Sequence, residues 1–141
     1  MKVLIMGCGR VGAHLASLLE NDGHEVTLLD VDASAFGKLH HTFRGNALLG
    51  DGTDEDSLRR ANIEKTDAFI ALTQADNTNI MAAQIAKSVF NVPKVVCRVY
   101  DPTREELYQE LGLDTICPTA LIAESVTDRL RDEGAPDRMN R

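Results

Sequence analysis

A glycine-rich segment near the N-terminus constrains the fold of this chain more than any other feature. Residues 3–12 read VLIMGCGRVG, an apolar run followed by the spacing G-x-G-x-x-G. The run predicts a strand, and an apolar stripe at Val11, Leu15, Leu18 and Leu19 predicts a helix that ends before Gly23. Three glycines at the turn between a strand and a helix are typical of a β-α-β unit that binds nucleotide phosphates.

The rest of the chain repeats this alternation of strand and helix. Strands are expected at 2–6, 25–30, 46–49, 67–72, 94–99 and 114–117. Further helices are expected at about 54–61, at 77–90, from Thr103 to Gly112 and at about 119–132. Capping boxes are expected at Thr53 with Asp56 and at Thr103 with Glu106.

Continuous apolar strands between helices indicate a parallel sheet that is buried on both faces. The sequence therefore predicts one α/β domain over residues 1–132, a Rossmann-like doubly wound fold with a six-stranded parallel sheet. Residues 133–141 are interpreted as a polar C-terminal tail or a cut linker.

Composition excludes several classes of function. No apolar run approaches the roughly 20 residues of a membrane-spanning helix, and no secretory signal precedes the first strand, so a cytoplasmic location is expected. The net charge of −7 argues against general binding of nucleic acid. The three cysteines and four histidines follow no disulfide or metal-binding pattern, and Cys97 and Cys117 are interpreted as small buried hydrophobes.

The glycine loop and the following strand predict specific contacts with a nucleotide. Gly7 permits a tight turn, Gly9 lets the backbone approach a diphosphate, and Gly12 lets the helix pack closely on the strand. Asp30 ends the second expected strand, where a carboxylate accepts hydrogen bonds from ribose hydroxyls, and Asp32 adds charge that disfavours the 2′-phosphate of NADP. The alternative is a glycine turn beside an unrelated aspartate.

Arg10 lies inside the loop, where its guanidinium is placed to meet a terminal phosphate; the alternative is a solvated arginine on the surface. Residues for catalysis are not evident. A dehydrogenase needs a substrate-binding region and a proton donor or acceptor, and no Tyr-x-x-x-Lys or G-x-S-x-G pattern occurs. The sequence thus favours ligand binding over chemistry.

The motifs resemble those of the N-terminal nucleotide-binding lobe of RCK/KTN domains, the Trk/Ktr-type regulators of potassium channels and transporters. The matching segments are GCGRVG at 7–12, LLDVD at 28–32, GDGTDE at 50–55, DAFIALTQADNTNI at 67–80, VVCRVYDPT at 95–103 and LGLDTICPTALIAE at 111–124. The resemblance implies a regulatory subunit that is not an enzyme. It would bind NAD(H), ATP, ADP or AMP, form a homodimer or a higher ring, and reach the inner face of the cell membrane through a potassium channel or transporter.

Carried over residue by residue, the resemblance implies one binding site. Gly7, Gly9, Arg10 and Gly12 would cradle phosphates, with Val11 between them. Asp30 would take the ribose, beside Val31 and Asp32. The remaining implied residues are Asp51, Gly52 and Thr53 near the adenine, Thr73 and Gln74 flanking the nucleotide, Arg98 at the phosphates, and Arg104 at this site or at that of a neighbouring subunit.

Each of these roles has a structural alternative. Asp51 and Thr53 fit a turn and helix cap equally well, Arg98 is able to pair with a surface carboxylate, and Arg104 is able to be simply solvated. The helices at 77–90 and 119–132 carry more apolar residues than one covered face needs, which predicts a two-fold interface; the alternative is that both only cover the sheet. Two other functions stay open: the cofactor domain of an NAD-dependent oxidoreductase that lacks its substrate domain, and a scaffold without ligand.

Overall fold

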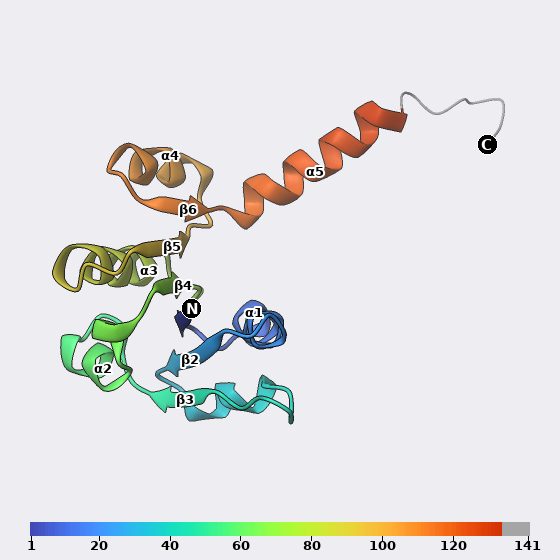
Figure 1. The fold of residues 1–141 in the computed structure, drawn as a ribbon. Helices are drawn as coiled ribbons and strands as arrows, with labels where there is room; N and C mark the ends of the chain where they lie inside the picture. Colours follow the sequence, from blue (N-terminus) through green and yellow to red (C-terminus); the bar gives the residue numbers. More distant parts are fainter. Residues whose placement is uncertain (134–141) are drawn as a thin grey trace.

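A six-stranded parallel sheet forms the centre of the molecule (Figure 1). The computed structural model describes residues 1–133. The strands are β1 (Lys2–Met6), β2 (Glu25–Asp30), β3 (Asn46–Leu49), β4 (Ala68–Ala71), β5 (Lys94–Arg98) and β6 (Asp114–Ile116). Their order in the sheet is β3-β2-β1-β4-β5-β6, which confirms the doubly wound fold and places the change of winding direction between β1 and β4.

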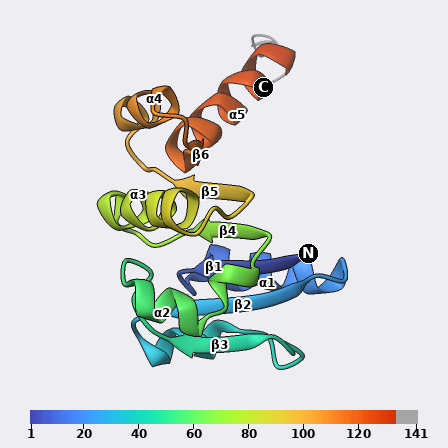
Figure 2. The same ribbon diagram turned by 60° about the vertical axis from the view of Figure 1, so that its left-hand side comes forward.

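Helices connect the strands on both faces of the sheet. The α-helices are α1 (Arg10–Asn21), α2 (Glu55–Arg60), α3 (Asp76–Gln84), α4 (Pro102–Glu110) and α5 (Pro118–Glu133). Short 3-10 turns follow β2 (η1, Ala33–Lys38) and α2 (η2, Ile63–Lys65), and α3 continues into a π-helical turn (η3, Ile85–Val89). In Figures 1 and 2, α1 lies on one face of the sheet, and α2, α3 and α4 lie on the other.

Two apolar clusters pack against the two faces. The larger one joins Leu4, Phe69 and Cys97 of the sheet to Leu58, Ile63 and Ile80 from the α2–α3 side. The smaller one joins Ile5 and Leu28 to Ala13 and Ala16 of α1, and it contains no residue of β5 or β6. The second half of the sheet is therefore well covered on only one face.

Two helix caps and half of one apolar stripe were predicted wrongly. Leu15 and Leu19 of the stripe pack against the sheet as expected, but Val11 and Leu18 are about half exposed. The closest contact of α1 with the sheet uses Gly12, Ala13 and Ala16. Small residues are buried at these positions because they let the helix approach the strands closely. The caps differ too: Asp54 caps α2 by accepting from Ser57, and Asp101 caps α4 by accepting from Thr103. A nearby aspartate replaced the predicted threonine in both turns.

The two helices expected at an interface behave differently. In α3, Ile80, Ala82 and Ala83 are buried against the sheet, so this helix covers the sheet as the alternative reading expected. In contrast, α5 extends away from the sheet (Figure 1), and its apolar residues Leu121, Ile122, Val126 and Leu130 are exposed. The alternative that α5 only covers the sheet is therefore wrong. The polar segment expected from residue 133 lies, beyond its first residue, outside the described residues.

Candidate functional site

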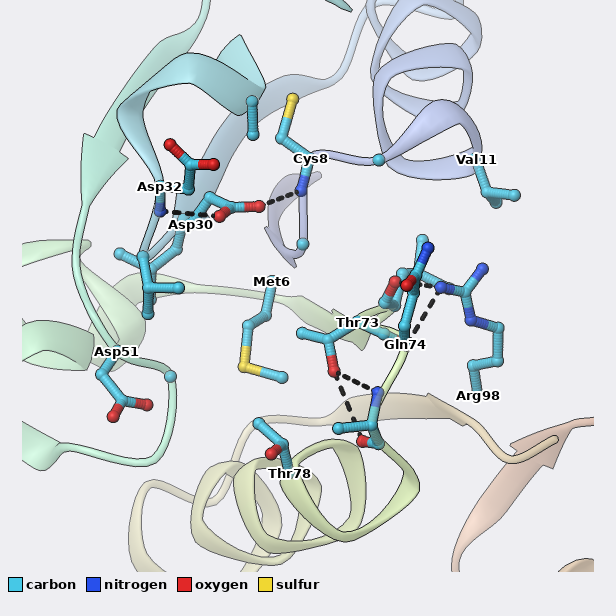
Figure 3. A pocket seen from close by; sticks show the side chains of 18 of the residues that line it. Met6, Cys8, Val11, Asp30, Asp32, Asp51, Thr73, Gln74, Thr78 and Arg98 are labelled. Carbon is cyan, nitrogen blue, oxygen red and sulfur yellow. Dashed lines mark hydrogen bonds between the residues drawn. The ribbon is translucent and has the colours of Figure 1, made fainter. Parts of the chain in front are cut away.

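A cleft of about 920 Å³ opens at the carboxyl ends of β1, β2, β4 and β5 (Figure 3). This is the edge at which parallel α/β sheets bind ligands, next to the change of winding direction. Twelve of the fifteen residues implied by the sequence line it: Gly7, Gly9, Arg10, Val11, Asp30, Val31, Asp32, Asp51, Gly52, Thr73, Gln74 and Arg98. Gly12, Thr53 and Arg104 do not line it.

The glycine loop has the geometry that the sequence predicted. Gly7 adopts φ +106°, and a Cβ atom there would lie 2.9 Å from the main-chain carbon of Leu72. At Gly12, a Cβ atom would lie 2.0 Å from the carbonyl oxygen of Gly7, so only glycine allows α1 to start so close to the loop. Gly9 faces open space and is the N-cap of α1, with no side chain capping the helix. The first N–H groups of α1 are therefore available to an anion.

Asp30 connects the glycine loop to the end of β2. One carboxylate oxygen accepts the main-chain N–H of Cys8 at 2.8 Å, and the other accepts the N–H of Asp32 at 2.9 Å. The carboxylate is half-buried and lines the cleft (Figure 3). Each carboxylate oxygen accepts more than one hydrogen bond, so the group retains capacity for hydroxyl donors.

The turn after Asp30 is organised by a second carboxylate. Asp32 accepts hydrogen bonds from the N–H of Ser34 at 2.9 Å and from its hydroxyl at 2.7 Å. These bonds, with a smaller contribution from the positive charge of Lys38, lower the pKa of Asp32 below its ordinary value. Val31 points outward, with 70% of its surface exposed. This corner of the cleft therefore combines a fixed negative charge with an uncovered apolar side chain.

The segment after β3 forms a tight turn under the opposite side of the cleft. Asp51 accepts from the N–H of Thr53 at 2.9 Å and from its hydroxyl at 2.7 Å, which is the local turn that the sequence left open. The helix cap predicted there belongs to Asp54. Gly52 lies so close to Met6 that a Cβ atom would overlap the Met6 sulfur. The backbone of this turn thus lines the floor of the cleft.

Arg98 is a buried cation at the end of β5. Its side chain is 8% exposed, and its Nη2 donates to the carbonyl oxygens of Leu72 and Thr73, the second at 3.0 Å. The guanidinium lies 4.8 Å from the centre of the Tyr100 ring, and its Nε is buried without a hydrogen-bond partner. The alternative in which Arg98 pairs with a surface carboxylate is wrong, because it forms no salt bridge with the described residues.

The remaining residues divide between the cleft and the surface. Thr73 and Gln74 follow β4 and lie beside Arg98 on the same wall of the cleft (Figure 3). Arg10 is exposed at the mouth of the cleft. Arg104 is exposed on α4, where it donates to Asn77 at 3.2 Å.

Ten residues that line the cleft were not predicted from the sequence. The missed residues are Met6, Cys8, Leu29, Ala35, Lys38, Gly50, Leu72, Ala75, Thr78 and Tyr100. Most lie within two or three residues of a strand end, so their position on the carboxyl edge is the signal that was available. The exceptions are Ala35 and Lys38 of η1 and Ala75 and Thr78 at the start of α3, which the connections after β2 and β4 bring to the cleft.

The three cysteines, Cys8, Cys97 and Cys117, are buried and free. This confirms the interpretation of Cys97 and Cys117 as small buried hydrophobes. Burial raises the pKa of the Cys97 thiol to about 11, with Asp76 and Asp114 adding to the shift, and burial also raises the pKa of Cys8. Within residues 1–133, no cluster of three or more His, Cys, Asp or Glu side chains is placed to hold a metal ion.

Comparison with known proteins identifies the family. The family model described as TrkA-N domain matches residues 3–119. The chain belongs to the TrkA-N domain family. It is 44% identical over 135 residues to the Trk system potassium uptake protein TrkA of Streptomyces coelicolor, and 34% identical over 130 residues to a TrkA homologue of Methanothermobacter thermautotrophicus. These alignments cover 96% and 92% of this chain but 60% of each relative, so the chain spans less than two thirds of their length.

Solved TrkA-N and RCK structures share the fold. The TrkA-N domain of inner membrane protein ybaL from Escherichia coli superposes with a TM-score of 0.81 at 18% identity, covering 92% of this chain and 96% of that domain. The Kef C-terminal domain of Shewanella denitrificans in its AMP-bound form gives 0.79 at 21% identity, covering 96% and 83%. A GsuK channel bound to NAD gives 0.69 at 20% identity, covering 83% and 21%. Among the described residues, no helix has the length and apolar content needed to cross a membrane.

Proposed function

We propose that this chain is the nucleotide-binding lobe of a regulator of potassium uptake, and that it binds an adenine nucleotide or NAD(H) without converting it. Family membership and the 44% identical TrkA of Streptomyces coelicolor support the connection with potassium uptake. The observation that carries the proposal is the bond from Cys8 N–H to the Asp30 carboxylate. This bond holds the Asp30 carboxylate, which we propose as the ribose acceptor, close to the uncapped N–H groups of α1.

The proposed ligand follows the cleft from β2 toward β5. The N–H groups at Gly9 and the first turn of α1 bind a diphosphate, Asp30 binds the adjacent ribose, and the 50–52 turn with Val31 contacts the adenine. Arg10 and Arg98 supply positive charge for the phosphates or the second half of a dinucleotide. Among the described residues, the buried guanidinium of Arg98 has carbonyl oxygens and the Tyr100 ring as partners but no carboxylate, so an anion would provide the missing countercharge.

A second copy of this chain is the proposed partner of α5. The four exposed apolar residues of α5 lie on a helix that the sheet does not support, and such a helix is marginal on its own. The sheet leaves a matching uncovered area, since Val96 of β5 is only half-buried and Ile116 of β6 is 41% exposed. A homodimer that exchanges these surfaces buries both. In that arrangement Arg104 contributes to the neighbouring site, and the assembly reaches the cytoplasmic face of a potassium transporter.

Calorimetric titration with AMP, ADP, ATP and NADH tests the proposal directly. We expect saturable binding of at least one of them, with no change in the ligand when it is recovered and analysed by mass spectrometry. A lack of binding by all four would contradict the nucleotide proposal. Oxidation of an alcohol or hydroxy acid by this chain with NAD would instead support the oxidoreductase alternative.

A further inference from the structure

Asn79 is a buried amide behind the cleft wall. It lies in α3 at the end of the first turn, is 0% exposed, and does not line the cleft itself. Burying an amide is unfavourable unless its hydrogen-bonding groups all find partners. The partners of Asn79 therefore indicate what this position does.

All four hydrogen-bonding positions of the Asn79 amide are used. Its Oδ1 accepts from the N–H of Thr73 at 2.9 Å and from the Thr73 hydroxyl at 2.7 Å. Its Nδ2 donates to the carbonyl oxygens of Thr73 at 2.9 Å and Arg98 at 3.1 Å. Main-chain N–H groups only donate and carbonyl oxygens only accept, so these partners determine which way the amide points.

These bonds join the ends of two neighbouring strands. Thr73 follows β4 and Arg98 ends β5, and the Arg98 side chain donates back to the carbonyl oxygen of Thr73 at 3.0 Å. Asp76, one turn earlier on α3, reinforces the junction by accepting the N–H of Tyr100 at 2.9 Å. The main chain and the guanidinium of Arg98 are thus both held against the same segment.

We propose that Asn79 is a positioning residue for the half of the ligand that lies beyond the adenosine monophosphate. Asp30 and the glycine loop, at β2 and β1, face the ribose and the first phosphates. The wall formed by Thr73, Gln74 and Arg98, at β4 and β5, faces whatever follows them. Without the Asn79 amide, the main chains of Thr73 and Arg98 lose their common support. The Thr73 carbonyl oxygen that accepts from the Arg98 guanidinium is then less well fixed. This inference rests on the proposed function and adds a second, separable claim to it.

The test compares AMP with NADH and ATP on Asn79→Asp, which keeps the side-chain volume. The substitution replaces an N–H₂ group by an oxygen that faces two carbonyl oxygens, so both donated bonds are lost. At a temperature where circular dichroism shows a folded chain, we expect NADH and ATP to bind about ten-fold more weakly and AMP to change by less than about two-fold. Ile63→Val, in the core behind α2, is the stability control and should leave all three affinities unchanged.

A second pair of variants covers the case in which Asn79→Asp does not fold. Thr73→Val removes the hydroxyl that donates to Asn79, whereas Thr73→Ser keeps it. We expect Thr73→Val to weaken the binding of NADH and ATP selectively, and Thr73→Ser to recover most of that loss because it keeps the hydroxyl donor. Equal losses for AMP, NADH and ATP in a folded variant would overturn the positioning role, and so would unchanged affinities. Failure of the parent chain to bind any nucleotide would instead overturn the proposed function.

Discussion

A Cβ atom at Gly12 would lie 2.0 Å from the carbonyl oxygen of Gly7. This contact links the third glycine of the loop to the first, and it explains why α1 begins directly against β1. At Gly9, in contrast, a Cβ atom would meet nothing within 4 Å and would project into open space. The three glycines therefore have two different roles, one in packing and one in access to the loop.

The pair Gly12→Ala and Gly9→Ala separates these roles. We expect Gly12→Ala to lower the free energy of unfolding by about 1–3 kcal/mol, because the helix or the loop must move to accept the methyl group. Gly9→Ala should unfold close to the parent and yet lose nucleotide affinity, since the methyl group occupies the diphosphate position. Denaturant unfolding and calorimetry measure the two effects. Full stability in Gly12→Ala would contradict the packing role.

Removal of the Asp30 carboxylate should weaken the binding of every adenine nucleotide. Asp30→Ala removes the ribose acceptor and the anchor of the Cys8 N–H, and we expect about 10- to 100-fold weaker binding of AMP and NADH. Asp67→Ala is a matched control, because Asp67 accepts the N–H of Lys2 at 2.8 Å at the opposite edge of the sheet. Equal losses in the two variants would point to general destabilisation.

Discrimination against a 2′-phosphate should depend on Asp32 as well as Asp30. We expect the parent chain to bind NADPH at least about ten-fold more weakly than NADH, because in the proposed binding mode the carboxylates of Asp30 and Asp32 would both lie near the 2′-phosphate. Asp32→Asn keeps an acceptor for Ser34 but removes one negative charge. The ratio of NADH affinity to NADPH affinity should therefore fall several-fold. Competition titrations with the two reduced cofactors measure the ratio. Equal binding of NADH and NADPH by the parent would be inconsistent with this explanation.

Acid should weaken the start of α2 through Asp54. Hydrogen bonds from the Ser57 hydroxyl and N–H lower the pKa of Asp54 below its ordinary value of 3.8. The folded pKa is the lower one, so the cap stabilises the chain above that ordinary value and the contribution is lost as pH falls through the folded pKa. We expect Asp54→Ala to melt below the parent at neutral pH, with a difference that shrinks below about pH 4. Asp54→Asn and Asp54→Ala are both neutral at this position, so the difference in melting temperature between these two variants should not change with pH over this range.

The proposed dimer predicts a change in mass when α5 is made polar. We expect the parent to elute as a dimer in light-scattering chromatography and the double variant Ile122→Asp, Val126→Asp to elute as a monomer, because both side chains are exposed on α5. Glu124→Ala on the same helix is the control and should remain dimeric. A monomeric parent would argue that α5 is covered by a segment of a longer chain instead.

The sequence pattern predicted much of the fold. All six strands lie within one or two residues of their expected bounds. The central strands β1, β2 and β4 are mostly buried and form continuous apolar runs, whereas the edge strands β3 and β6 are mostly exposed and were recognisable only from their place in the alternation of strands and helices. The glycine loop and Asp30 were also recognisable, since their spacing reflects a turn that few other residues allow. Caps were less predictable: Thr53, Asp54 and Asp51 are adjacent acceptors, and only the path of the chain selects among them.

Sequence alone determined the order of strands and helices along the chain, the glycine loop and the aspartate that ends β2, because each depends on residues close together in the chain. Tertiary structure decided which distant residues share the cleft. The Arg98 side chain donates to the carbonyl oxygens of Leu72 and Thr73 and not to a carboxylate. The Asn79 side chain donates to the main chain at the ends of β4 and β5. The strand order places β4 between β1 and β5. No local sequence pattern encodes which buried side chain will form hydrogen bonds with the main-chain N–H and carbonyl groups at the end of each strand.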